Sequence, residues 1–168
     1  MAAVRRAAAI AHRADQRVAL TLSDPFCVER HRAAFLDLVA DHVDILFANE
    51  AEILCLYELD DFDAALPRVA SHCAVAALTR GAHGSVVVSG SERHHVLAPP
   101  VTVVDTTGAG DLYAAGFLAG LTRERPLDEC AQLASLAASE VISHLGARPE
   151  ASLQDLAAGL LPERRPGS

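Results

Sequence analysis

The sequence contains neither lysine nor tryptophan, and among its 168 residues only five are phenylalanine and two are tyrosine. All 14 basic residues are therefore arginines, and 22 acidic residues outnumber them, giving a formal net charge of -8. Proteins that bind nucleic acids neutralise phosphates with clustered Lys and Arg. The charge balance therefore argues against nucleic acid as a partner.

Cysteines are few, and no long hydrophobic run is present. The four cysteines are widely separated in apolar surroundings, at Cys27, Cys55, Cys73 and Cys130. This spacing fits neither a CxxC metal site nor a dense disulfide framework, so buried free thiols are expected. No apolar run approaches the roughly 20 residues that span a bilayer, and the N-terminal stretch lacks an export-signal cleavage site. We therefore expect a cytoplasmic protein without a membrane partner.

Short apolar runs alternate with longer segments of helical periodicity, and 51% of the residues are hydrophobic. Strands are expected at Val18–Leu22, Asp44–Phe47, Ala74–Thr79, Ser85–Ser89, His94–Ala98 and Val101–Val104. Helices are expected at Met1–Arg17 (as the end of a helix), Pro25–Ala40, Glu50–Tyr57, Phe62–His72, Gly110–Leu121, Leu127–His144 and Leu153–Leu160, with a frayed tail at Pro162–Ser168. The alternation predicts an α/β fold with a mainly parallel sheet flanked by helices.

The most informative segment passes from an apolar run through a polar corner into an alanine-rich helix. It reads Asp105-Thr106-Thr107-Gly108-Ala109-Gly110-Asp111. Two glycines let a ligand approach the backbone closely, and the free N–H groups of an opening helical turn suit a phosphate. Asp111 would lie beside that anion, where a carboxylate can accept a proton from a hydroxyl. The segment therefore favours phosphoryl transfer.

Simpler explanations of this segment exist. A Thr or Asp before a helix and an acidic residue in its first turn are ordinary capping features. A dinucleotide-binding fingerprint would need Gly or Ala at the sixth position, where Tyr113 stands. A P-loop would need a Gly-Lys ending, which a chain without lysine cannot supply. Capping and phosphoryl transfer both stay open on these residues alone.

Two further sets of residues have both a structural and a functional interpretation. Asn49 and Glu52 form either a variant of the capping box or an oxygen-rich pair suited to Mg²⁺ and its waters. Thr79, Gly81 and Gly84 follow an expected buried strand. They form either a plain turn or a ligand-binding loop beyond a strand end.

In this order, the segments resemble the PfkB, or ribokinase-like, family of carbohydrate and nucleoside kinases. The similarity lies in the Asp105–Asp111 run, in Asn49-Glu50-Ala51-Glu52 and in Thr79–Ser85. Three other stretches are most similar to the adenosine kinase branch: Leu22–Phe26, Val43–Phe47 and Arg125–Cys130.

The resemblance implies transfer of the γ-phosphoryl group of ATP to a primary hydroxyl of a nucleoside, adenosine first, with a sugar as the alternative. It makes Asp111 the base and Gly108, Ala109 and Gly110 the anion hole. It assigns the nucleotide to Thr79, Gly81, Gly84 and Thr106. Asn49 and Glu52 would organise Mg²⁺ through water, and Asp105 and Thr107 would hold a monovalent cation such as K⁺, completed by the loop before Gly146.

Members of that family are longer, and the resemblance begins near the middle of their fold. We therefore expect a single partial kinase domain over residues 1–168, comprising the C-terminal, nucleotide-binding half. The Gly-Gly-Asn segment and lid strands that bind the acceptor in the family have no counterpart here. Expected partners are a small nucleoside or sugar, and either a second copy or a complementary N-terminal half. A non-catalytic fragment that binds a nucleotide or a partner is the alternative.

Overall fold

The computed structural model describes residues 2–160, so the expected frayed tail lies outside the described residues. Within that range the fold is α/β with a mainly parallel sheet, as predicted; it has seven α-helices and five strands, where six strands were expected. The chain divides into two compact units. Unit 1 comprises Met1–Gly81 and Val86–His94, and unit 2 comprises Ala82–Ser85 and His95–Ser168. The single partial kinase domain stays a prediction.

The sheet has the strand order β1-β2-β3-β4-β5. Its strands are β1 (Ala19–Thr21), β2 (Ile45–Asn49), β3 (Val75–Thr79), β4 (Ser85–Ser89) and β5 (Glu92–Val96). The first three are parallel, with Thr21 opposite Phe47 and Asn49 opposite Thr79. The connections to β4 and β5 are too short for a parallel crossover, so the chain reverses at each of them.

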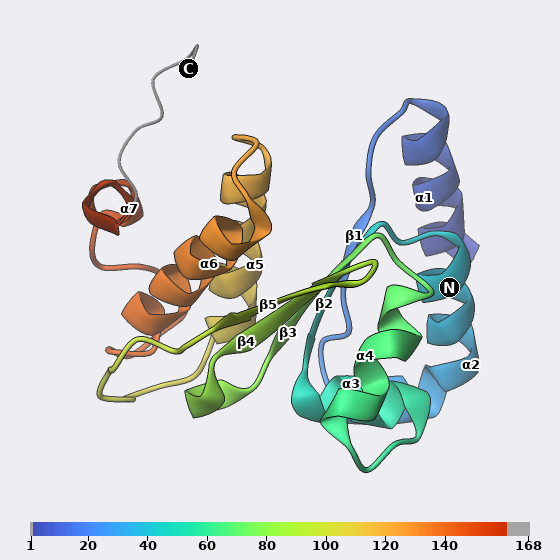
Figure 1. The fold of residues 1–168 in the computed structure, drawn as a ribbon, viewed down its shortest axis with the longest axis horizontal. Coiled ribbons are helices and arrows are strands. Elements are labelled where there is room, and N and C mark those ends of the chain that lie inside the picture. The colour runs from blue at the N-terminus through green and yellow to red at the C-terminus, as the bar shows by residue number, and fades with distance from the viewer. Residues whose placement is uncertain (1, 161–168) are drawn as a thin grey trace. The chain divides into compact units, whose positions relative to one another are not determined.

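Four helices belong to unit 1 and lie on the same side of the parallel strands (Figure 1). They are α1 (Ala2–Arg13), α2 (Pro25–Asp41), α3 (Glu50–Tyr57) and α4 (Phe62–Ala70). The first four residues of β2 and of β3 are all buried, which explains their unbroken apolar sequences. Core side chains from the strands and helices pack together, among them Leu46, Leu78, Val39, Ile53 and Leu66.

In unit 2, helix α5 (Ala109–Leu121) packs closely on α6 (Leu127–Val141), and α7 (Leu153–Leu160) follows. Glycines make this approach possible. A Cβ at Gly116 would lie 2.7 Å from the Leu133 carbonyl oxygen, and one at Gly120 would lie 2.9 Å from Cys130 Sγ. Burial raises the pKa of the Cys130 thiol to about 11, as expected for a free thiol in this packed interface.

Some predicted boundaries were wrong. Val101–Val104 is not a strand, because the Val104 N–H donates to the Ile142 carbonyl, 2.8 Å away, instead of to a neighbouring strand. Val104 is 53% exposed, and the preceding Pro99-Pro100 pair supplies no N–H donors. β5 begins at Glu92, two residues before the prediction, and α6 ends at Val141 rather than His144. No helix within the described residues is long and apolar enough to cross a bilayer.

Candidate active site

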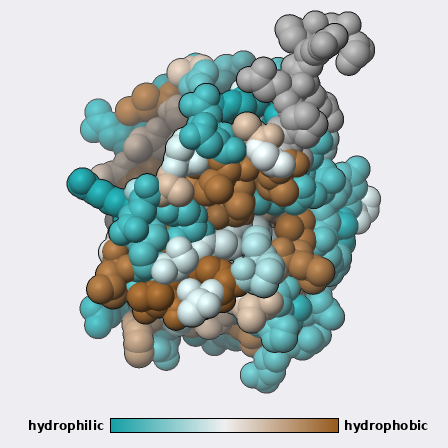
Figure 2. Space-filling model, turned by 90° about the vertical axis from the view of Figure 1, so that its left-hand side faces the viewer, coloured by the Kyte–Doolittle hydropathy of each residue, from teal (hydrophilic) through white to brown (hydrophobic). Residues whose placement is uncertain are grey.

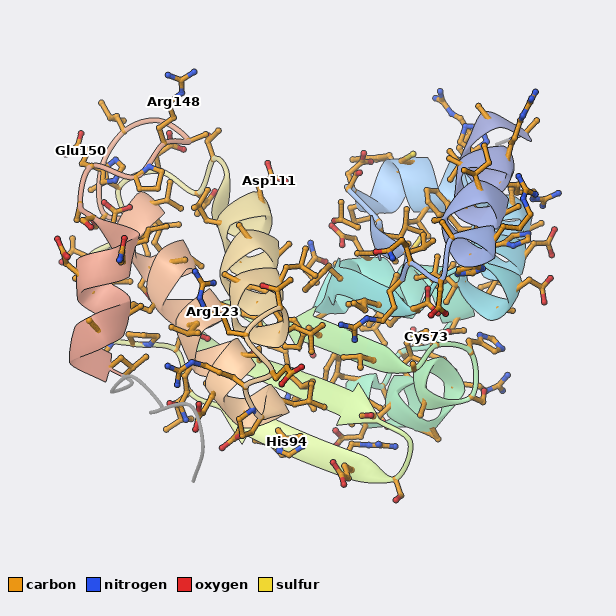
Figure 3. All side chains as sticks on the ribbon, turned by 90° about the horizontal axis from the view of Figure 1, so that it is seen from above. Cys73, His94, Asp111, Arg123, Arg148 and Glu150 are labelled. Carbon is orange, nitrogen blue, oxygen red and sulfur yellow. The ribbon has the colours of Figure 1, made fainter. Side chains whose placement is uncertain are left out.

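The start of α5 carries the predicted base. Gly108 is the N-cap residue and has φ +83°, a left-handed conformation that favours glycine. Asp111 follows in the first turn of the helix, where its side chain is exposed. Figure 3 shows this side chain projecting from the N-terminal end of α5. Here the helix dipole favours an anion, so the carboxylate and a bound phosphate can share one region.

The three backbone N–H groups of the predicted anion hole differ in their hydrogen bonds. The Ala109 N–H donates to the Thr106 carbonyl at 3.2 Å, so it is already used inside the turn. The N–H groups of Gly108 and Gly110 donate to no backbone carbonyl in the part of the chain that the structure describes, apart from bonds internal to helices. An anion hole here would therefore consist of the Gly108 and Gly110 donors, with the Ala109 donor closing the turn.

Asp105 ties the corner to the loop that follows α6. Its Oδ1 accepts the Thr107 hydroxyl at 2.7 Å and the Thr107 N–H at 2.9 Å, while Oδ2 accepts the Gly146 N–H at 3.0 Å. The Thr107 hydroxyl, followed by the two N–H groups, lowers the pKa of this carboxyl. Asp105 and Thr107, predicted to hold a cation, are thus brought together, and the Gly146 N–H also contacts Asp105.

Gly108 also has a packing reason to be glycine. A Cβ at this position would lie 2.8 Å from the Ala147 Cβ and 3.0 Å from the Ala147 Cα. Ala147 belongs to the same loop as Gly146, so this loop supports the corner at two points. A Cβ at Gly110, in contrast, would meet nothing within 4 Å. The space next to Gly110 is open to a ligand.

In unit 1, Asn49 and Glu52 form the capping box. The Asn49 side chain accepts the Glu52 N–H at 2.9 Å and donates to Glu52 Oε1 at 2.7 Å, while the Asn49 N–H donates to Oε2 at 2.9 Å. The structural interpretation of this pair is therefore confirmed. Glu52 is only 5% exposed, and this burial, together with the nearby charge of Asp24, raises the pKa of its carboxyl.

Three polar residues lie at or shortly after the carboxyl ends of the parallel strands in unit 1. Asn49 and Thr79 are register partners at the ends of β2 and β3, and Asp24 follows β1 and caps α2 by accepting the Cys27 N–H at 2.8 Å. Ligands of open α/β sheets bind beyond such strand ends. Asp24 was not predicted as a site residue, although an aspartate three residues after the end of a strand is a recognisable signal.

Arg80, which follows Thr79, was also missed. Its guanidinium lies 2.8 Å from Glu50 Oε1 and 4.2 Å from the centre of the Phe62 ring. The arginine therefore ties the end of β3 to α3 and α4, and the backbone of the predicted nucleotide loop starts from a fixed point. An ion pair stacked on an aromatic ring cannot be inferred from residues 30 and 18 positions away in sequence.

The two glycines of that predicted loop differ in their surroundings. Gly81 has φ +55°, and a Cβ there would meet nothing within 4 Å, so its backbone is accessible. Gly84 has φ +83°, and a Cβ there would lie 2.0 Å from the Val96 carbonyl oxygen. The backbone of the Val96–Ala98 segment lies too close to this position for any side chain, and this packing is sufficient to explain a glycine at position 84.

Residues able to hold a metal directly are sparse. Among the described residues, no group of three or more His, Cys, Asp or Glu side chains could hold a metal ion. Both carboxylate oxygens of Glu52 already accept hydrogen bonds from Asn49. Oxygen donors of this kind suit Mg²⁺ that retains several waters. The pair therefore fits a water-mediated Mg²⁺ and does not fit a dehydrated ion.

A cavity of about 500 Å³ lies among α5, α6 and α7 in unit 2. It is lined mainly by apolar and small side chains, including Ala115, Ala119, Leu133 and Leu153, with Arg123 and Arg125 also contributing. No predicted site residue lines it. Figure 2 views the molecule from the side on which α6 and α7 lie, and apolar surface gathers near the middle of this view.

Comparisons with known proteins give a consistent result. The sequence profile of the pfkB family of carbohydrate kinases matches residues 1–153. The cytidine kinase of Thermococcus kodakarensis is 39% identical over 118 residues, which are 68% of this chain and 42% of that protein. Among solved structures, the adenosine kinase of Sinorhizobium meliloti superposes with a TM-score of 0.91 at 53% identity. The probable sugar kinase of Rhizobium etli does so with a TM-score of 0.91 at 49% identity.

Both superpositions cover 95% of this chain and 49% of the other. The chain therefore spans about half the length of the relatives it matches.

Proposed function

The chain belongs to the pfkB family of carbohydrate kinases, and from this premise we propose that it serves ATP-dependent phosphorylation of a primary hydroxyl group on a nucleoside, adenosine first. The observation that carries the proposal is the corner from Gly108 to Asp111. It combines an exposed carboxylate, a helix N-terminus and an open space beside Gly110. The adenosine kinase of S. meliloti, at 53% identity, favours adenosine as the acceptor.

In the proposed reaction, an Asp111 carboxylate oxygen accepts the proton of the acceptor hydroxyl. The hydroxyl oxygen forms a bond to the γ-phosphorus of ATP as the bond to the bridging oxygen breaks, and ADP leaves with that electron pair. The N–H groups of Gly108 and Gly110 stabilise the charge of the transferring group. Such reactions depend on positioning and charge stabilisation more than on covalent chemistry by the protein.

The nucleotide itself needs contacts of a different kind. The accessible backbone of Gly81 and the Thr79 hydroxyl are proposed to bind its phosphates and ribose, with Gly84 shaping that loop and Thr106 contributing beside the anion hole. Asn49 and Glu52 are proposed to hold Mg²⁺ through water, and Mg²⁺ would neutralise part of the polyphosphate charge. Because Asn49 already fixes Glu52, this carboxylate is oriented before any ion arrives.

A monovalent cation such as K⁺ is proposed next to Asp105 and Thr107. Both oxygens of Asp105 already accept hydrogen bonds from this corner and from Gly146. The carboxylate would therefore act on the cation mainly through its charge and by orienting nearby carbonyl groups. Comparing turnover in K⁺ and in Na⁺ tests this proposal directly.

Two alternatives are favoured by specific observations. The R. etli relative, at 49% identity, supports a sugar as the acceptor. The coverage of 49% of each solved relative supports a chain that binds a nucleotide or a complementary half without turning substrate over by itself. Supplying adenosine, other nucleosides and sugars in one ADP-release assay separates these possibilities.

The test of the base is Asp111→Asn in the active kinase, with Asp128→Asn as the matched control. Both residues are acidic and lie in the first turn of a helix, Asp111 in α5 and Asp128 in α6. Losing the general base should lower turnover about 10²- to 10⁴-fold, while ATP affinity stays within a few-fold. The control should keep near-normal turnover. If Asp111→Asn also keeps it, the assignment of the base is wrong.

A further inference from the structure

One carboxylate holds the far end of the loop that follows α6, residues 142–151. Glu140 lies in the last turn of α6, and its side chain is only 8% exposed. Its Oε1 accepts the N–H groups of Glu150 and Ala151, each at 2.8 Å, and lies 3.3 Å from His144 Nε2. A single oxygen thus gathers the helix end and the loop end.

The charge of Glu140 strengthens this arrangement. Burial alone would raise the pKa of its carboxyl, but the N–H groups of Ala151 and Glu150 and the His144 ring together lower it. Hydrogen bonds to an ionised acceptor are about twice as strong as neutral ones. Within the described residues, the other oxygen of Glu140 is buried and has no hydrogen-bond partner. All of the contacts with the loop therefore pass through Oε1.

The near part of the same loop contacts the Gly108 corner. The Ile142 carbonyl accepts the Val104 N–H at 2.8 Å, and the Gly146 N–H donates to Asp105. The Ala147 Cβ lies only 2.8 Å from where a Cβ of Gly108 would be. In Figure 3, Arg148 and Glu150, from the remainder of the loop, lie at the same end of unit 2 as Asp111. The loop is thus a brace between Glu140 and the corner.

We propose that Glu140 is a positioning residue of the phosphoryl-transfer site. It fixes residues 142–151, and these residues hold the Gly108 corner in the conformation that presents its N–H groups. The effect of Glu140 on turnover rests on the proposed function, whereas its effect on the conformation of the loop and of the corner does not. Glu140 itself touches neither Gly108 nor Asp111 through any described hydrogen bond, so it acts through the brace.

The experiment measures amide hydrogen exchange in the 168-residue chain with Glu140→Gln, and Glu150→Gln is the matched control. Both variants remove one carboxylate near His144, but the Glu150 side chain is 74% exposed and only its backbone N–H contacts Glu140. In Glu140→Gln, exchange should accelerate about tenfold or more at Glu150 and Ala151, and several-fold at the hydrogen-bonded amides of Gly146, Thr107 and Ala109. The centres of α5 and α6 and the whole control should remain as in the wild type.

Two outcomes overturn the proposal. In one, Glu140→Gln accelerates exchange at Glu150 and Ala151 and leaves the Thr107 and Ala109 amides unchanged, so that the brace does not reach the corner. In the other, Glu150→Gln gives the same pattern, so that charge near His144 explains everything.

Ala147→Gly keeps the test decisive if Glu140→Gln does not fold. It removes the exposed methyl group that faces Gly108. Exchange at the Thr107 and Ala109 amides should rise while Glu150 and Ala151 stay protected; no change at the corner would count against the brace.

Kinetics separate this inference from the function on which it partly rests. In the active kinase, Glu140→Gln should lower kcat several-fold with KM for ATP unchanged, because the corner acts on the transferring group. Because a loss of folded protein would also lower the apparent kcat at unchanged KM, kcat is calculated per folded enzyme molecule. A wild-type kinase that phosphorylates no nucleoside or sugar would refute the proposed function, and the exchange result would still decide the brace.

Discussion

Two glycines of the same corner should respond in opposite ways when each receives one methyl group. At Gly108, φ is +83°, and a Cβ would lie 2.8 Å from the Ala147 Cβ. A left-handed conformation costs a non-glycine residue about 1–2 kcal/mol, and overpacking adds about 1–3 kcal/mol. Gly108→Ala should therefore lower the free energy of unfolding by about 2–5 kcal/mol, a large part of the roughly 5–15 kcal/mol that a domain possesses.

At Gly110 the same change should stabilise the protein. The residue is helical, and its Cβ would meet nothing within 4 Å. Alanine in a helix is more favourable than glycine by about 0.5–1 kcal/mol. Gly110→Ala should therefore raise the free energy of unfolding by about that amount. If a phosphate occupies the open space, the methyl group should also weaken ATP binding, so stability and affinity would change in opposite directions.

Urea denaturation measures both variants against the wild type, with equal slopes m showing that the denatured states are comparable. ATP affinity is then titrated on the same preparations. Changes of equal sign, or a Gly108→Ala variant within about 0.5 kcal/mol of the wild type, would refute the geometry at the corner. If the Gly110→Ala variant binds ATP normally, the space beside Gly110 does not bind a phosphate of ATP.

Other predictions concern the metal and the state of the chain. Glu52→Gln should raise the Mg²⁺ requirement of the active kinase; a residue that only caps α3 would instead cost about 1 kcal/mol or less and leave that requirement unaltered. Burial raises the pKa of the Glu52 carboxyl, and Mg²⁺ needs its ionised form. The Mg²⁺ concentration that the wild type requires should therefore increase as the pH falls through that raised pKa. Mg²⁺ titrations at several pH values should show that Glu52→Gln loses this pH dependence. The isolated 168-residue chain should associate with itself or with a complementary half, because apolar surface gathers near the middle of the face seen in Figure 2, and it should not phosphorylate adenosine or sugars. Light scattering and an ADP-release assay check this, and a stable monomer with acceptor-dependent turnover would contradict it.

Most elements followed from local sequence patterns, because their causes are local. Asn49 and Glu52 lie three residues apart, so the capping box could be read from their spacing, and the structure contains it. The apolar run at Val101–Val104 misled the prediction for the opposite reason. Whether such a run becomes a strand depends on a neighbour that offers hydrogen bonds, and the acceptor of the Val104 N–H is Ile142, 38 residues further on.

The residues of the candidate site differ in the same way, according to whether their contacts are local or distant in sequence. The corner around Gly108 could be recognised because all of its chemistry lies within seven consecutive residues. The role of Glu140 could not, because a glutamate near the end of a helix is ordinary on a solvated face. Only the folded loop shows that two backbone N–H groups, ten and eleven residues further on, converge on its Oε1. Contacts that define a brace have no sequence motif.

The brace also sets an order of events when the chain is synthesised. Asp111 and the glycines of the corner leave the ribosome before the residues that support them, since Gly146, Ala147 and Ala151 all follow α6. At about 5–20 residues per second, the interval between Asp111 and Ala151 is roughly 2–8 s. For most of it, until Gly146 and Ala147 have been added, the polar corner has neither the Gly146 donor nor the Ala147 methyl group. The corner must therefore acquire its final conformation late, after α5 and α6 are complete.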